Sequence, residues 1–144
     1  MGSMISKLRK FMAFTRSEKI LFLQAVFVLP VISWLLRVIS VSRLCRWIES
    51  SSKNVPAADM GVIASTCHML DSAARVAFPP YTCLEKSLAL RWLLLQRGIS
   101  TSLHFGIRNG HGLDGHAWLE YGGVPIHDSP DVRKEYAAFA IRSQ

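Results

Sequence analysis

The sequence predicts an α+β fold, in which apolar helices come first and a small antiparallel sheet packs on a buried helix. Residues 17–49 are strongly apolar and have helical spacing. Residues 83–96 carry apolar side chains on almost every side of the expected helix, which is typical of a helix in the middle of a domain. After Gly98, a good helix C-cap, apolar residues alternate as they do in strands.

Length and composition indicate one small folded domain. The chain has 144 residues, of which 50% are hydrophobic and 19% charged, and this composition disfavours a disordered chain. Met1-Gly2-Ser3 before Met4 resembles a cloning scar and is left out of the fold prediction. Three cysteines without framework spacing, and no signal peptide, favour a reducing cytoplasm.

The positive charge is concentrated in residues 1–53, which hold nine Lys/Arg against Glu18 and Glu49. Such a region could meet an acidic peptide, a partner protein or an anionic membrane, or it could be a solvated helix face. Nucleic acid is disfavoured because no nucleic-acid-binding motif accompanies the charge.

Three helices are expected before residue 80. Ser17 could cap a first helix over residues 18–29, Pro30 marks a break or kink, and a second helix covers residues 31–49. Packing on the rest of the chain is the default for this region, with peripheral membrane contact, burial against a partner or a membrane span as alternatives. A polar linker over residues 50–56 leads to a third helix over residues 56–77. There Cys67 and His68 are interpreted as structural, because adjacent positions lack zinc-ligand spacing.

Cys83 is expected in the first turn of the helix over residues 83–96. Thr82 fits the N-cap, Glu85 completes a capping box, and Pro79 and Pro80 prevent an earlier start. A cysteine there faces unpaired backbone N–H groups and the positive end of the helix dipole, which favours the nucleophilic thiolate.

The second half is expected to form three strands and a short helix. Leu103, Phe105 and Ile107 share one face of the first strand, and residues 109–115 form a loop rich in turn residues. The second and third strands cover residues 116–121 and 124–128, and residues 131–141 form a terminal helix.

His116 and Asp128 follow Cys83, and a Cys that converges with a His and an Asp is typical of cysteine peptidases and transglutaminase-like enzymes. Residues directly opposite each other in a hairpin share a face. A two-residue turn at Gly122-Gly123 would place Asp128 opposite Ala117, whereas a three-residue turn would place it opposite His116. We therefore predict an odd or bulged turn, and a tight two-residue turn would count against the triad.

Other residues compete for the same roles. His111 and Trp118 are candidate substrate contacts, although a solvated surface position and core packing explain them as well. Rival imidazoles and carboxylates are His104, His111, His127, Asp114 and Asp131. His127 is expected on the opposite strand face from Asp128.

Four segments together resemble the leader peptidase of lasso-peptide biosynthesis. They are Cys83-Leu84-Glu85-Lys86-Ser87-Leu88-Ala89-Leu90-Arg91, Arg97-Gly98-Ile99, Gly106-Ile107-Arg108 and His116-Ala117-Trp118-Leu119-Glu120. That bacterial family has a transglutaminase-like, papain-related catalytic domain. The resemblance is tight over residues 78–131 and looser before them. It implies a helical region over residues 4–53, a catalytic domain over residues 54–144, and Cys83, His116 and Asp128 as the triad.

The resemblance also implies a reaction, hydrolysis between the leader and the core of a ribosomally made precursor in the bacterial cytoplasm. The N-terminal half is too short and apolar to hold a leader-recognition domain as well as the helices. The resemblance therefore implies a stand-alone peptidase that works with a separate leader-recognition protein and an asparagine-synthetase-like cyclase. No metal or organic cofactor is expected. The alternatives are a transglutaminase-like acyltransferase, which shares the acyl-thioester step, and a non-catalytic module that binds the precursor.

Overall fold

The computed structural model describes residues 12–51, 60–77, 79–110 and 112–140. In these residues the helices α2 (Arg16–Val38), α3 (Val41–Ser50), α4 (Met60–Ala74) and α5 (Cys83–Leu95) come first. The second half contains β1 (Ser102–Gly110), β2 (Gly112–Tyr121), β3 (Val124–Ile126), the short α6 (Val132–Glu135) and β4 (Ala137–Ala140). The predicted α+β class is confirmed.

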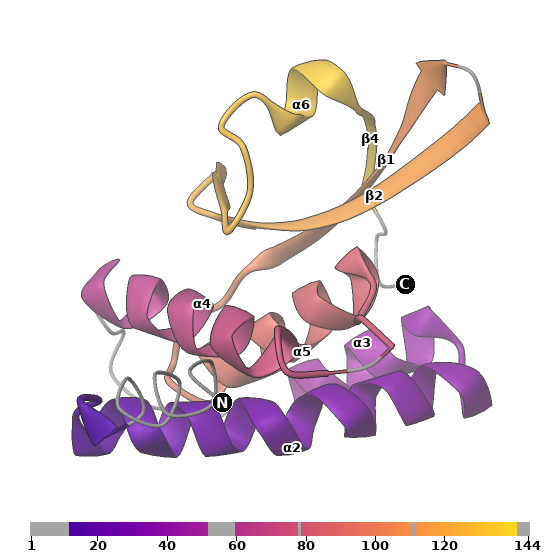
Figure 1. Ribbon diagram of the computed structural model, residues 1–144. Helices are drawn as coiled ribbons and strands as arrows, with labels where there is room; N and C mark the ends of the chain where they lie inside the picture. The colour runs from indigo at the N-terminus through magenta and orange to yellow at the C-terminus, as the bar shows by residue number, and fades with distance from the viewer. Residues whose placement is uncertain (1–11, 52–59, 78, 111, 141–144) are drawn as a thin grey trace.

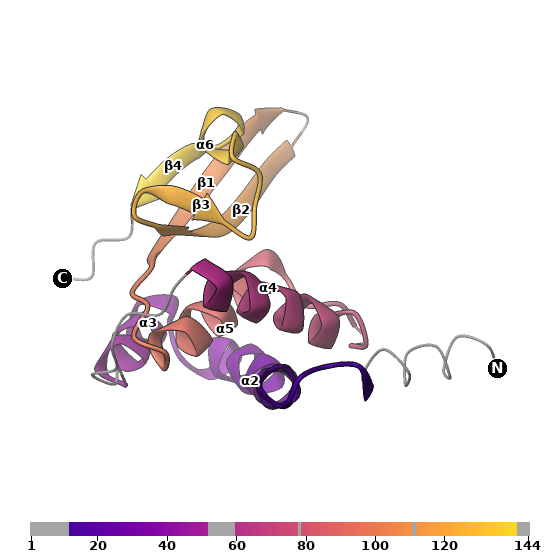
Figure 2. The same ribbon diagram turned by 90° about the vertical axis from the view of Figure 1, so that its left-hand side faces the viewer.

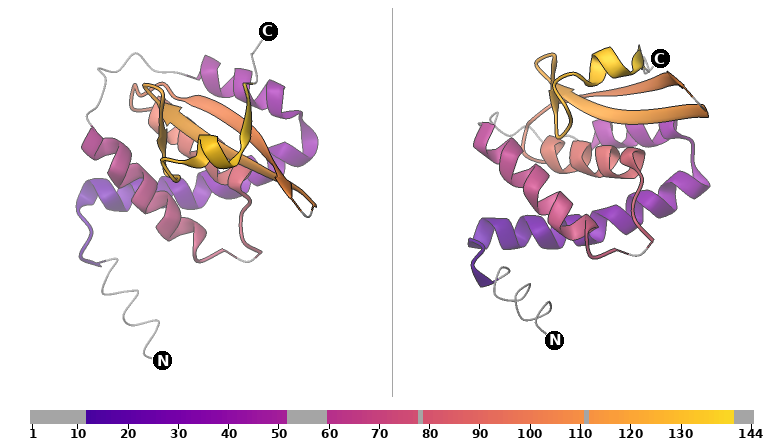
Figure 3. Two further views of the ribbon diagram at one scale, coloured as in Figure 1. Left: turned by 90° about the horizontal axis from the view of Figure 1, so that it is seen from above. Right: turned by 45° about the horizontal axis from the view of Figure 1, so that its top comes forward.

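The elements form two layers, one of helices and one of strands (Figure 1). The sheet is antiparallel with strand order β3-β2-β1-β4, and α6 lies on its far side from the helical layer (Figure 2). Seen from above, the sheet lies over the helices (Figure 3). Helix α5 contacts α2, α3 and α4 as well as β2, so it is the central element of the fold.

Helix α2 continues through Pro30, so of the predicted break or kink the break is wrong, as is the start of a second helix at residue 31. The helix starts after Thr15, whose side chain and that of Glu18 form a capping box, so Ser17 is not the cap. Pro30 is exposed inside the helix. The loss of one backbone hydrogen bond there is offset because the buried face of Leu21, Ala25 and Leu29 continues past Pro30 to Ile32. The break comes instead at Ile39 and Ser40, which are extended.

Helix α5 has no exposed residue, in agreement with its apolar sequence. Its second half is buried in the main core, and Ser87 Oγ donates a hydrogen bond of 3.1 Å to the Ala117 carbonyl. Arg91 also forms an ion pair with Glu49 of α3 at 2.6 Å. The helix is therefore fixed both to the sheet and to the other helices.

The first two strands are longer than predicted, the third is shorter because it ends at Ile126, and a fourth strand is present. The expected loop over residues 109–115 largely pairs as strand, since Arg108 lies opposite Asp114 and Ile107 opposite Gly115. The expected terminal helix is reduced to the four residues of α6, after which β4 pairs with β1. The free edge of β1 offers backbone groups that need partners, and this outweighs the helix propensity of an alanine-rich segment. Of the expected linker over residues 50–56, Ser50 belongs to α3, and residues 52–56 with the expected domain boundary after residue 53 lie outside the described residues.

One helix in the described part of the chain, α2, is long and apolar enough to cross a membrane by length and composition. The same test is passed by core helices of soluble proteins and by signal sequences. In this structure one face of α2 packs against α4 and α5.

Candidate active site

Cys83 is held at the start of α5 by the predicted capping box, which is confirmed. Thr82 Oγ1 accepts a hydrogen bond from the Glu85 N–H at 3.3 Å, and Glu85 Oε2 accepts one from the Thr82 N–H at 2.6 Å. Burial by itself raises the pKa of Glu85, but hydrogen bonds from Ser33 and Thr82 outweigh it and leave this pKa below its usual value. The carboxylate therefore stays ionised and keeps the helix start at Cys83.

The two other cysteines lie in different surroundings. Burial raises the pKa of the Cys45 thiol. Burial, followed by the nearby charge of Asp71, raises the pKa of Cys67 to about 11. Both groups are therefore held as thiols at neutral pH, and Cys83 is the cysteine that lines a cavity.

His116 and Asp128 are brought together by the sheet and the connection that follows it. His116 Nε2 and Asp128 Oδ2 are 2.5 Å apart, and both side chains are partly buried. The other carboxylate oxygen, Oδ1, accepts a hydrogen bond of 2.7 Å from the Ser129 N–H. The Ser129 N–H therefore orients one oxygen of the Asp128 carboxylate, and the other oxygen contacts the imidazole.

This contact forms through a turn that differs from the predicted one. Leu119 pairs with Ile126 and Tyr121 with Val124, so the turn at Gly122-Gly123 has two residues, and the prediction of an odd or bulged turn is wrong. Both glycines have positive φ angles, 58° and 82°, which is the conformation of the two-residue turns that hairpins favour.

Asp128 nevertheless reaches His116 because the strand ends before it. Strand β3 stops at Ile126, and His127 adopts a φ of 62°, a left-handed conformation rare for residues other than glycine. This turns the chain out of the strand, so the alternation of faces no longer applies. His127 Nε2 lies 2.8 Å from Asp71 Oδ2 of α4, which ties the strained residue to the helical layer.

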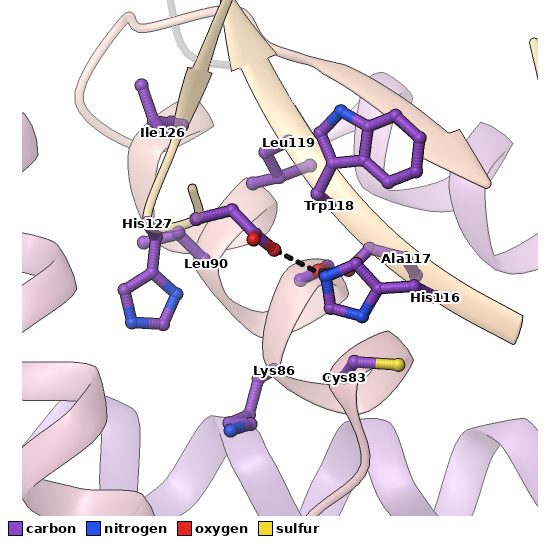
Figure 4. A pocket seen from close by; sticks show the side chains of 11 residues that line it. Cys83, Lys86, Leu90, His116, Ala117, Trp118, Leu119, Ile126 and His127 are labelled. Carbon is purple, nitrogen blue, oxygen red and sulfur yellow. Dashed lines mark hydrogen bonds and ion pairs between the residues drawn. The ribbon is translucent and has the colours of Figure 1, made fainter. Parts of the chain in front are cut away.

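The three predicted residues line one small cavity of about 100 Å³ (Figure 4). Figure 4 shows Cys83 at the start of α5, below the His116 ring. Because Nε2 contacts Asp128, the second ring nitrogen, Nδ1, is the one on the side of Cys83. Among the described residues no hydrogen bond joins the Cys83 thiol to His116, and such contacts commonly tighten only when substrate binds. The cavity wall is completed by Lys86, Ser87, Leu90, Ala117, Trp118, Leu119, Ile126 and His127.

Away from Cys83, the His116 ring packs against the aromatic rings of Trp118 and Tyr136. Trp118 is only 1% exposed, and its indole stacks near the imidazoles of His116 and His104 with interplanar angles of 18°. This placement favours core packing over contact with a substrate. The Tyr136 ring lies 5.0 Å from the His116 ring. Gly106 makes room for this cluster, since a Cβ at that position would lie 2.5 Å from the Cβ of Tyr136.

A buried carboxylate fixes this aromatic cluster. Glu120 accepts hydrogen bonds from Arg133 and, at 3.0 Å, from the Trp118 indole N–H, and it lies 3.3 Å from His104. The hydrogen bonds from Arg133 are the main reason that the pKa of Glu120 is below its usual value. The network fixes Trp118 and through it the plane on which His116 rests.

The rival residues lie elsewhere or have other partners. Asp114 pairs with Arg108 at 2.7 Å, and Asp131 pairs with Lys134 at 2.6 Å, so neither serves His116. His111, the second candidate substrate contact, lies outside the described residues. Sequence reasoning missed Lys86 and His127 as cavity residues. Lys86 could have been found from its position one turn after Cys83, whereas His127 shows no local signal.

A second, larger cleft of about 490 Å³ borders the same helix start. It lies between α2 and the segment that enters α5, and it is lined by Pro30, Ser33, Arg37, Ala77, Pro79, Pro80, Tyr81, Thr82 and Glu85. The two capping-box residues of α5, Thr82 and Glu85, thus belong to its wall.

No group of three or more His, Cys, Asp or Glu side chains that could hold a metal ion occurs among the described residues. A cysteine at a helix start, facing an imidazole on a sheet that a nearby carboxylate contacts, is the arrangement of papain-like cysteine peptidases and acyltransferases. The family comparison agrees with this class. Residues 24–140 match the model of the transglutaminase-like superfamily, and the chain belongs to that superfamily. Comparisons with curated proteins and with solved structures gave no match.

Proposed function

We propose that this protein is a cysteine peptidase that uses Cys83, His116 and Asp128. The contact of 2.5 Å between His116 Nε2 and Asp128 Oδ2 carries the proposal, because it leaves Nδ1 of the ring on the side of Cys83. An imidazole held in this way is ready to take a proton from the thiol.

The reaction follows from these roles. His116 Nδ1 accepts the thiol proton as Cys83 Sγ attacks the carbonyl carbon of the scissile peptide bond. His116 then gives that proton to the leaving amine, the C–N bond breaks, and an acyl-thioester remains on Cys83. Water, deprotonated by His116, attacks the thioester and releases the carboxylic acid and the thiol. Asp128 holds the Nε2–H tautomer and stabilises the imidazolium between these steps.

The start of α5 supplies a place for the negative charge of the tetrahedral intermediate. The Glu85 N–H is occupied by Thr82, which leaves the N–H groups of Cys83 and Leu84 without an acceptor inside the helix. Donors of this kind, together with the helix dipole, stabilise an oxyanion.

The substrate that we propose is a ribosomally made lasso precursor, cut between leader and core so that the freed amine of the core can close a macrolactam. The resemblance of residues 83–91 and 116–120 to lasso leader peptidases supports this choice. The small cavity beside Cys83 has room for a short side chain, and the larger cleft has room for an extended segment. A separate leader-recognition protein would present the precursor, and an asparagine-synthetase-like cyclase would use the product.

The test incubates the full chain with a candidate precursor and its recognition protein, and reads the products by mass spectrometry. We expect release of the leader, and a fall in rate on the order of 10⁴-fold for Cys83→Ala. Cys67→Ala is the matched control, because Cys67 lies outside the cavity and should be dispensable. An amine adduct that retains the leader would instead indicate an acyltransferase. Unchanged processing by Cys83→Ala would indicate a non-catalytic binding module.

A further inference from the structure

Helix α2 carries an exposed apolar ridge that the fold does not use. Six large apolar side chains, spaced three or four residues apart, are between 49% and 71% exposed. They are Ile20, Leu23, Phe27, Val31, Trp34 and Val38. Because a helix turns once every 3.6 residues, they form one straight ridge about 27 Å long. The opposite face of α2 is buried in the core, so the helix is apolar on two sides.

The ridge lies on the outer side of the helical layer. Figures 1 and 2 show α2 on the side of the other helices that faces away from the sheet. Cys83 and His116 lie where the helical layer meets the sheet. A surface that covers the ridge would therefore leave the cavity open.

Helices α2 and α3 carry exposed positive charges, of which Arg37 also acts on the Glu85 carboxylate. Arg16 and Arg37 are exposed in the first and last turns of α2, and Arg43 and Arg46 are exposed on α3. None of the four forms an ion pair with a described residue. The acidic groups of these two helices have other partners. Glu18 is bound to Thr15 in the capping box, and Glu49 is paired with Arg91.

We propose that this ridge is a docking surface for the headgroup region of an anionic membrane, with α2 lying in the plane of the interface. An exposed apolar ridge with Phe27 and Trp34 on it and an arginine in each end turn of the helix is typical of interfacial helices. A second copy of the chain would bring two positively charged faces together, so self-association does not fit the same pattern. The proposal is independent of the reaction proposed for Cys83.

The experiment is flotation of the purified full chain with vesicles. We expect the chain to float with vesicles of phosphatidylcholine and phosphatidylglycerol, much less with phosphatidylcholine alone, and less at high salt. Phe27→Gln with Trp34→Gln should lower partitioning by more than about tenfold, because both side chains would otherwise be buried in lipid. Val76→Gln with Val124→Gln is the matched control, since both valines are equally exposed but lie outside α2. It should float like the original chain.

A second set of variants in the flotation experiment tests the arginines. Changing Arg16, Arg43 and Arg46 to Gln should weaken binding about fivefold for each charge and remove most of the salt dependence. Circular dichroism and the thermal midpoint check that every variant is folded. The proposal is overturned if the folded chain does not bind anionic vesicles at low salt, or if Phe27→Gln with Trp34→Gln still floats. It is also overturned if light scattering shows a dimer that this double variant dissociates, or if alkaline carbonate fails to release the bound chain, which would indicate a spanning helix.

Discussion

The first turn of α5 and the connection between β3 and α6 supply side chains to the same cavity, but different interactions hold them. Cys83 is placed by neighbours in sequence, since its helix start depends on Thr82 and Glu85. Asp128 is placed by distant groups, because it follows the left-handed His127, which Asp71 of α4 holds. The first arrangement can be read from a few residues, whereas the second exists only in the folded chain.

The largest expected effect comes from removing the Asp128 carboxylate, which contacts between distant residues hold in place. Asp128→Ala should lower kcat/KM for precursor cleavage by about 10³- to 10⁴-fold, because His116 loses the group that fixes its tautomer. Asp131→Ala, which removes a nearby surface carboxylate paired with Lys134, should leave the rate unchanged. A mild effect of Asp128→Ala would remove Asp128 from the proposed triad.

Filling the space at Gly106 should disturb the packing behind His116. A Cβ there would lie 2.5 Å from the Cβ of Tyr136 and 3.0 Å from the Trp118 ring. Gly106→Ala should therefore lower the free energy of unfolding by about 1–3 kcal/mol, measured by chemical denaturation. Gly115→Ala is its control, since nothing lies within 4 Å of the new methyl group. Equal stability of the two variants would contradict the tight packing.

Breaking the tie between His127 and α4 should affect activity more than stability. Asp71→Ala removes the partner of His127 and should lower kcat about tenfold, because Asp128 is then less well positioned. Glu49→Ala breaks a comparable surface pair with Arg91 and should leave kcat unchanged. If both variants keep full activity, the left-handed turn holds Asp128 without help from α4.

The placement of Cys83 by its neighbours in sequence can be tested by comparing the capping boxes of α5 and α2, which have nearly the same geometry. Thr82→Ala and Thr15→Ala should each cost about 1 kcal/mol of stability. Only Thr82→Ala should also slow alkylation of Cys83 by iodoacetamide, measured by peptide mapping. Equal alkylation of Cys83 in both variants would show that the cap does not control the thiol.

The smallest expected effect is a pH dependence from the buried network. The pKa of Glu120 is lowered, so its contribution to stability is complete above the unfolded value of 4.5 and is lost as the pH falls below it. The unfolding free energy of Glu120→Gln should therefore decrease less between neutral and acid pH than that of the original chain. An unchanged slope would mean that other carboxylates dominate acid unfolding.

These differences explain what the sequence could predict. The capping box at Cys83, the apolar helix α5 and the α+β class depend on local signals or periodicity, and the structure agrees with them. The failures depend on tertiary contacts. Pro30 stays in a helix because its neighbours are buried, and the alanine-rich segment becomes β4 because β1 has a free edge. The proximity of His116 and Asp128 was expected from a three-residue turn, but the turn has two residues. The left-handed backbone of His127 directs the chain toward His116 instead.

The burial of α5 has a consequence for how such a protein can change over time. Residues 88–90 and 93–95 of this helix are buried, so a polar substitution there would disturb the core, and drift in sequence is expected to be slow at these positions. New specificities would have to arise in the surrounding strands and connections, while the thiol keeps its place. A redesign for another peptide would keep residues 83–95 and vary the residues outside this helix that line the two cavities.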